Sequence, residues 1–208
     1  MHAQTAKLIG VIAQNLPEMS DDLMQGWIEN PKGLQRIFKN ALCPPETIPN
    51  FKIWKTIKLG TGLKSADDFR QALKGGDFCI GDWANDILGK PAFTAVSEEI
   101  EVDLIVSSVA DLGFKNGATH RDIYKRAQEF GWELCPVEVG PQLRLQYTDQ
   151  PTGEWLLIAM EPISGSGGDL IVFSVERDDS GSWLYGNDGH PAYFWAAGNR
   201  WVFVRPRK

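Results

Sequence analysis

Cysteine and histidine are scarce in this chain, with three residues of each type. The cysteines, Cys43, Cys79 and Cys135, are odd in number, widely spaced, and set among apolar residues or prolines. This pattern argues against a disulfide framework, and the histidines and cysteines do not follow the spacing of a zinc site. We therefore expect buried thiols and no bound metal.

The sequence also lacks a long apolar run and an excess of positive charge. No segment approaches the roughly 20 apolar residues of a membrane span, and polar residues interrupt the stretch from Leu8 to Leu16. The formal net charge is −6 and the pI is about 5.1. Nucleic acid is bound mainly by clustered Lys and Arg, so an acidic chain is poorly suited to it. We predict a cytoplasmic protein that has no membrane partner.

What is present is an ordinary globular composition, with 208 residues, 43% of them hydrophobic and 23% charged. The first forty-odd residues carry apolar side chains at helical spacing in three short runs, and Pro44, Pro45 and Pro49 follow. Proline lacks an amide donor and restricts the preceding residue to extended conformations. We therefore predict a small helical module at 1–45, a proline-rich hinge at 46–50, and a main domain at 51–208.

Polar capping residues mark the starts of several predicted helices. They are Ser20, Asn30 followed by proline, the pair Ser65 and Asp68, and the pair Thr119 and Asp122. Each pair has the spacing of a capping box, in which the two side chains bind each other's backbone N–H groups.

Most of the main domain shows the apolar patterns of β-strands. Strands are predicted at 51–59, 100–109, 143–147, 155–160, 170–175, 183–185 and 201–204. We expect an α+β fold, mainly an antiparallel sheet with a few packed helices, preceded by the N-terminal helical module.

Four blocks of this domain resemble those of a group of uncharacterised bacterial proteins. They are FCIGDWANDIL (78–88), LCPVEVGPQLRLQY (134–147), WLLIAMEPI (155–163) and RWVFVR (200–205). The resemblance covers about residues 51–208. It implies a bacterial origin and one coherent domain, and it brings no activity, cofactor or catalytic residue.

The most specific candidate site lies on a predicted hairpin. A turn at 150–151 would place Arg144 and Trp155 on the same face of two paired strands, with Glu161 beside them and Glu138 extending the site. Arg144 offers a planar donor fork, Trp155 a stacking surface and Glu161 an acceptor, which suits a small anionic or nucleotide-like ligand. The alternative is a solvated sheet face with an incidental ion pair.

A second candidate site is the strand face that carries Lys52, Trp54 and Lys58, where cations alternate with an aromatic ring. This pattern is typical of platforms that bind single-stranded nucleic acid. The alternative is an edge strand whose lysines discourage pairing with another chain.

Catalytic constellations are each incomplete. Glu99, Glu101 and Asp103 alternate on one strand and could hold Mg²⁺, but no lysine follows in the pattern of a nuclease, so we favour an exposed acidic face. Nothing in the spacing brings Cys135 to His120, so we expect a structural thiol and an exposed helix histidine. The glycine clusters lack the residues of a phosphate loop. We assign no catalytic residue and expect no cofactor.

Eight tryptophans make the chain tryptophan-rich, and the C-terminal quarter is crowded with aromatic residues. We expect most of these rings in the core, while a partly exposed cluster would mark a protein-binding patch. The leading hypothesis is a non-enzymatic protein-binding or regulatory protein that uses this patch or the N-terminal helices. The alternatives are an enzyme or binding domain for a small anionic ligand, acting through Glu138, Arg144 and Glu161, and single-strand nucleic-acid binding.

Overall fold

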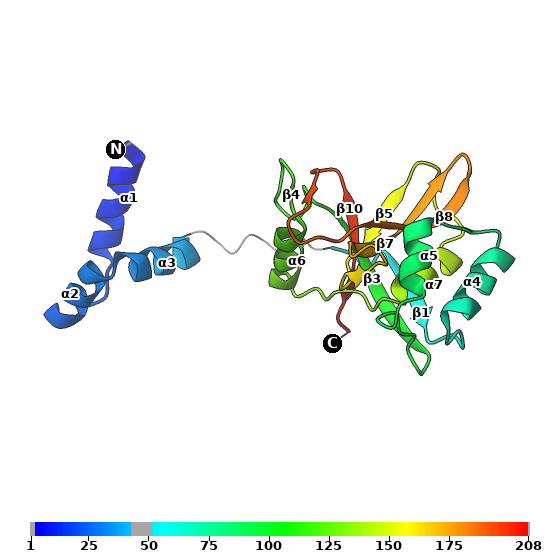
Figure 1. The fold of residues 1–208 in the computed structure, drawn as a ribbon. Helices are drawn as coiled ribbons and strands as arrows, with labels where there is room; N and C mark the ends of the chain where they lie inside the picture. The colour runs from blue at the N-terminus through cyan, green and yellow to red at the C-terminus, as the bar shows by residue number, and fades with distance from the viewer. Residues whose placement is uncertain (1–2, 43–50, 208) are drawn as a thin grey trace. The chain divides into compact units, whose positions relative to one another are not determined.

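The computed structural model describes residues 3–42 and 51–207. The chain divides into two compact units, Met1–Ile48 and Pro49–Lys208, and each is described by itself (Figure 1). Cys43 and the predicted hinge at 46–50 lie outside the described residues. No helix among the described residues has the length and apolar character needed to cross a membrane.

The described part of the N-terminal unit consists of helices α1 (Ala3–Gln14), α2 (Asp21–Glu29) and α3 (Pro31–Leu42). Two helix starts follow the predicted caps. The backbone N–H of Leu23 donates to the Ser20 hydroxyl at 3.3 Å, and that of Gly33 donates to the Asn30 side chain at 3.0 Å. The helices thus lie where the pattern placed them, and their action as a separate module stays a prediction.

The main unit is a mixed α and β structure built on a curled, mostly antiparallel sheet. The strands of the sheet are β1 (Lys55–Leu59), β2 (Cys79–Ile80), β3 (Ile100–Ser108), β5 (Trp155–Ile158), β6 (Ile163–Ser164), β7 (Leu170–Asp178), β8 (Gly181–Asp188) and β10 (Arg200–Arg205). They run in the order β1–β3–β10–β5–β7–β8–β2, with β6 beside β7, and the pairs β10–β5 and β8–β2 are parallel. The short strands β4 (Ala118–Thr119) and β9 (Phe194–Trp195) form a second, two-stranded sheet.

Helices cover both faces of the large sheet. They are α4 (Ala66–Gly75), α5 (Asp82–Leu88), α6 (His120–Glu129) and α7 (Val139–Gln146). In α7, Gly140 lies directly against Phe173 of β7, whereas in α6 the His120 ring lies 5.1 Å from Trp201 of β10. The strand register points Phe173 and Trp201 to opposite faces. Accordingly, α4, α5 and α7 gather on one side of the sheet and α6 on the other (Figure 1).

One predicted strand is wrong. Residues 143–147 form the last turn of α7 and its C-cap, so the predicted hairpin does not exist, and β5 pairs with β7 and β10 instead. Val139, Leu143 and Tyr147 are all buried and are spaced by four residues. At the end of this stripe, Leu143, Leu145 and Tyr147 also occupy alternate positions, as apolar residues of a strand would. The spacing of apolar residues alone therefore could not distinguish a helix from a strand. Pro141 lies in the first helical turn, where a missing N–H removes no helical hydrogen bond.

The other predicted strands each overlap an observed strand, and both predicted caps of the main unit are present. Ser65 and Asp68 form the complete box, with N–H···O distances of 3.1 and 2.9 Å. At Thr119 the hydroxyl accepts from the backbone N–H of Asp122 at 3.3 Å, and its own proton goes to the Asp122 carboxylate. Local side-chain chemistry therefore fixed the starts of α4 and α6.

The turn after β1 depends on a glycine that touches backbone. Gly60 has a φ of +66°, and a Cβ added there would lie 2.1 Å from the carbonyl oxygen of Glu98. Gly62 also has a positive φ, +95°, but has open space around it. We expect Gly60→Ala to lower the free energy of unfolding by about 3 kcal/mol or more, and Gly62→Ala by about 1 kcal/mol. Urea denaturation followed by circular dichroism measures both, and equal losses would contradict the steric explanation.

Candidate functional site

The guanidinium of Arg144 is fully buried at the end of α7. Its nitrogens donate to the side-chain oxygen of Gln150 and to the carbonyls of Tyr147 and Glu176, the last at 3.2 Å. The ring of Phe78 lies 4.9 Å from the guanidinium carbon. Burial lowers the pKa of Arg144 to about 10, so the group is still a cation at neutral pH. A buried charge is therefore held by neutral acceptors from three segments of the chain.

This arginine fixes the turn that follows α7. The buried amide of Gln150, which accepts from Arg144, donates to the carbonyl oxygens of Val175 at 3.1 Å and Glu154 at 3.2 Å. The guanidinium of Arg177 in turn donates to the carbonyl of Gln150 at 2.7 Å. The turn at 150–154 is thus tied to α7 and to β7 by side-chain hydrogen bonds.

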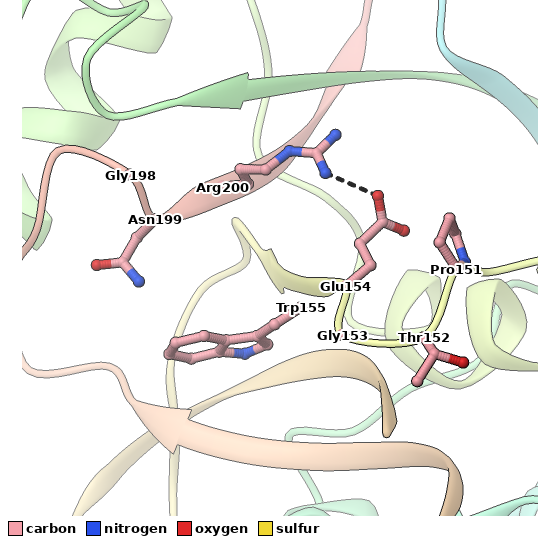
Figure 2. Close-up of a pocket in the computed structure, with 8 residues that line it drawn as sticks. All are labelled: Pro151, Thr152, Gly153, Glu154, Trp155, Gly198, Asn199 and Arg200. Carbon is pink, nitrogen blue, oxygen red and sulfur yellow. Dashed lines mark hydrogen bonds and ion pairs between the residues drawn. The ribbon is translucent and has the colours of Figure 1, made fainter. Parts of the chain in front are cut away.

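The same turn forms one wall of an open hollow of about 520 Å³ (Figure 2). The residues that line it are Pro151, Thr152, Gly153, Glu154, Trp155, Gly198, Asn199 and Arg200. An ion pair of 2.7 Å between Arg200 and Glu154 joins the two turns, and the Tyr147 hydroxyl donates to the second oxygen of the same carboxylate at 2.7 Å. Burial, strengthened by this hydrogen bond, raises the pKa of Tyr147. The charges of Glu154 and Arg200 at the hollow therefore neutralise each other.

The groups of the hollow left for a ligand are aromatic and neutral. The indole of Trp155 is 37% exposed. Among the described residues, no partner donates to or accepts from the side chains of Thr152 and Asn199. An aromatic surface beside a hydroxyl and an amide is suited to contact an uncharged polypeptide segment.

Trp155 belongs to a row of aromatic side chains. Its ring lies 6.1 Å from Trp195, which lies 4.8 Å from Tyr193 and 5.2 Å from the buried Trp201. Tyr193 is 43% exposed and the adjacent Phe194 is 59% exposed. The row connects the core to the surface, so the rings of Trp155 and Tyr193 rest on the buried Trp195.

The structure does not bring the four residues of the predicted anion site onto one sheet face. Glu138 and Arg144 are fully buried, Trp155 lines the hollow, and Glu161 is exposed in the segment after β5. The predicted common face is wrong because it required the hairpin, and a helix turns successive side chains in different directions. Ligand binding by these residues stays a prediction.

Glu138 instead begins a row of polar side chains along α7. Its carboxylate accepts from the backbone N–H of Gly60 at 2.9 Å and from the amide of Gln142, also at 2.9 Å. One turn further, Gln146 accepts from the N–H of Lys58 at 2.9 Å and donates to the carbonyl of Lys58 at 2.8 Å. The Gln146 amide thus pairs with the edge of β1 as a neighbouring strand would.

The residues predicted to bind single-stranded nucleic acid lie in and before that edge strand. Lys52 is exposed, Trp54 is half-buried with its ring 5.0 Å from that of Tyr147, and Lys58 pairs with Glu99 at 2.8 Å. Trp54 and Lys58 are therefore engaged within the chain. Nucleic-acid binding by these residues stays a prediction.

The acidic row on β3 is partnered by a C-terminal arginine. Arg207 pairs with Glu101 at 3.2 Å and with Asp103 at 2.9 Å, and the Thr56 hydroxyl donates to Asp103 at 2.6 Å. The hydrogen bond from Arg207, helped by Thr56, lowers the pKa of Asp103. Within the described residues, no group of three or more His, Cys, Asp or Glu side chains could hold a metal ion.

Cys135 agrees with its prediction, whereas Cys79 and His120 do not. Cys135 is buried as expected, and burial raises the pKa of its thiol, while Cys79 is only half-buried. The prediction of an exposed His120 is wrong, because its side chain is 2% exposed and packs 4.1 Å from Tyr124 and 5.1 Å from Trp201. The first residue of α6 faces the sheet, which the sequence spacing did not indicate.

No family model matches this chain, and neither a curated protein nor a solved structure was found to be similar to it. Function must therefore be inferred from the residues and their geometry. Sequence reasoning identified Trp155 but missed Glu154, Asn199 and Arg200, which complete the hollow. The ion pair spans 46 residues, and only the turn residues before Trp155 gave a local signal.

We expect Arg144→Ala to lower the free energy of unfolding by about 3 kcal/mol or more. The change leaves a cavity and removes a donor from Gln150 and from two backbone carbonyls. Arg205→Ala is the matched control, because Arg205 is exposed and interacts, among the described residues, through a 3.5 Å hydrogen bond to the Phe51 carbonyl and the charge of Asp103. Its effect should stay within about 0.5 kcal/mol. Chemical denaturation at neutral pH tests both, and similar stabilities would contradict a structural role for Arg144.

The burial of His120 predicts a pH-dependent stability. Burial lowers the pKa of His120 to about 4, against the attraction of Asp188, whereas the unperturbed value is 6.5. The unfolded chain therefore takes up the proton first, and stability present above about pH 6.5 falls as the pH approaches about 4, by up to about 3 kcal/mol. His120→Phe should show a smaller loss between these pH values in urea denaturation. His190→Ala, which removes only the smallest cause that lowers the pKa of His120, should keep most of the wild-type loss, and equal losses in all three proteins would refute the assignment.

Proposed function

We propose that the main unit is a non-enzymatic protein-binding domain. It recognises a segment of another protein at the hollow between the turns 151–155 and 198–200, with Trp155 as the central contact. The observation that carries this proposal is an exposed indole, supported by a buried aromatic row, beside unpartnered neutral polar groups.

This arrangement has the composition of a protein interface. Such surfaces concentrate binding energy in a few aromatic or arginine side chains and surround them with polar groups. Here Trp155, Tyr193 and Phe194 supply exposed rings, and Thr152 and Asn199 supply polar groups at the hollow. Trp155 and Tyr193 bind without a large loss of conformational entropy, because the adjacent Trp195 already restricts their motion.

The charge pattern limits the kind of segment that fits. Glu154 and Arg200 pair with each other, and Glu154 also accepts from Tyr147, so neither needs a partner of opposite charge. A strongly charged segment would have to displace this pair. An uncharged, extended segment with an apolar side chain over the indole is the better match.

The N-terminal unit offers a second surface for the same function. Taken by itself, it exposes the apolar side chains of Leu8, Ile9, Val11, Leu16, Leu23, Met24, Ile28 and Ile37. Amphipathic helices of this kind commonly bind in the grooves of partner proteins. We keep the Trp155 hollow as the primary site, since its support is built into the sheet.

The two alternative functions have weaker support. A small anion bound through Glu138 and Arg144 would need buried groups that already hold backbone and amide partners. Single-strand nucleic acid bound through Lys52, Trp54 and Lys58 would compete with Tyr147 and Glu99 for the last two side chains. The protein-binding hypothesis needs no such rearrangement.

We expect Trp155→Ala to abolish the capture of a specific partner. The tagged full-length protein would be purified from cells of its own species at native levels, and the recovered proteins quantified by mass spectrometry. A partner bound through Trp155 should be depleted about 30-fold in the variant, the effect of removing one dominant interface residue. The purified partner would then be titrated against both proteins by calorimetry.

Trp83→Ala is the matched control, because Trp83 is 48% exposed and lies on α5, on the other face of the sheet. It should capture the partner as the wild type does. Recovery of the same proteins by all three versions, or of none by the wild type, would reject the proposal.

A further inference from the structure

A second hollow, of about 340 Å³, lies at helix α6 and shares no residue with the Trp155 hollow. Two adjacent rows of α6 line it, His120 with Tyr124 and Arg121 with Lys125, each pair four residues apart. Glu161, from the segment after β5, lies on another wall. The volume is that of a small-molecule site.

His120 forms a buried part of the wall of this hollow. The residue is 98% buried, since only 2% of its surface is exposed, and both ring nitrogens lack a hydrogen-bond partner. Buried polar atoms without partners are rare and destabilise the folded chain. With its ring uncharged at neutral pH, as the lowered pKa of His120 implies, His120 adds no charge to the hollow. Its ring nitrogens lie too deep for direct contact with a ligand, so the residue contributes an aromatic wall.

The neighbouring charges of the hollow are also unpaired. Among the described residues, no ion pair or side-chain hydrogen bond involves Arg121, Lys125 or Glu161. The Tyr124 hydroxyl, in contrast, is fully engaged, donating to the Met160 carbonyl at 2.9 Å and accepting from its N–H at 3.0 Å. The hollow therefore offers two cations on one helix, a carboxylate on another wall, and a neutral imidazole.

We propose that this hollow binds a small zwitterion of the α-amino-acid class. The ligand carboxylate binds Arg121 and Lys125, and its ammonium group donates to Glu161. A simple anion would face the repulsion of Glu161, and a simple cation that of the two basic side chains. A molecule with both charges pairs with all three charged residues at once. The site is independent of the proposed protein-binding surface.

The test is a titration of the full-length protein with the standard α-amino acids one at a time, with acetate and methylammonium as single-charge probes. The Cε1 proton of His120, observed by NMR and assigned with His120→Phe, reports on this site alone. At least one amino acid should shift this resonance saturably, while acetate and methylammonium at the same concentration should not.

Variants then separate this site from nonspecific charge effects. Lys125→Ala and Glu161→Gln each remove one charged contact from an exposed residue and should weaken binding about tenfold. Lys74→Ala, an exposed lysine at the end of α4, should bind as the wild type does, and so should Trp155→Ala. The proposal is overturned if no amino acid moves the His120 resonance, if acetate alone moves it equally, or if Lys125→Ala binds as tightly as Lys74→Ala.

Discussion

The buried guanidinium of Arg144 is the constraint on which the architecture of the main unit depends. A cation removed from water must bind acceptors, and in this chain all of them are neutral: the Gln150 side chain and the carbonyls of Tyr147 and Glu176. These acceptors come from the turn after α7, from the C-cap of α7 and from β7. The carbonyl at the helix C-terminus also carries the negative end of the helix dipole. The charge can therefore be buried only when helix, turn and strand are assembled together, which couples three segments into one cooperative unit.

The hydrogen bonds of Arg144 also fix the surface around the Trp155 hollow. The hydrogen bond from Arg144 fixes Gln150, and the amide of Gln150 binds the carbonyl of Glu154. The turn therefore leaves the core in a fixed direction and places Glu154 opposite Arg200. The indole of Trp155 then rests on Trp195, whose ring contacts the fully buried Trp201. An exposed aromatic ring on such a support loses little entropy on binding, and a recognition surface gains affinity from that. Core packing and the proposed recognition surface are thus linked through two series of contacts. One runs from Arg144 through Gln150 to Glu154, and the other runs from Trp201 through Trp195 to Trp155.

Local signals in the sequence predicted much of this fold, and the failures have a physical cause. Side-chain caps at Ser20, Ser65 and Thr119 and the apolar strand patterns act within a few residues, so the starts of α2, α4 and α6 and six of the seven predicted strands were correct. The strand prediction for 143–147 was wrong because apolar residues spaced by four on a helix also fall on alternate positions of the sequence. The hollow depends on an ion pair across 46 residues, and the burial of His120 depends on β10, far along the chain. Neither relation leaves a local pattern, so the sequence alone located Trp155 but not its surroundings.

The pairing of charges separates the two hollows by the chemistry they can recognise. At the Trp155 hollow, Glu154 and Arg200 neutralise each other, so selectivity there comes from shape, aromatic area and neutral hydrogen bonds. At the α6 hollow, Arg121, Lys125 and Glu161 have no such partners among the described residues, and the adjacent imidazole is unsatisfied, so selectivity there comes from charge. Both hollows adjoin one aromatic cluster, since Trp201 contacts Trp195 on one side and His120 on the other. A ligand that moved the His120 ring would therefore press on the same tryptophan that supports the protein-binding row, which gives the two sites a physical path for coupling.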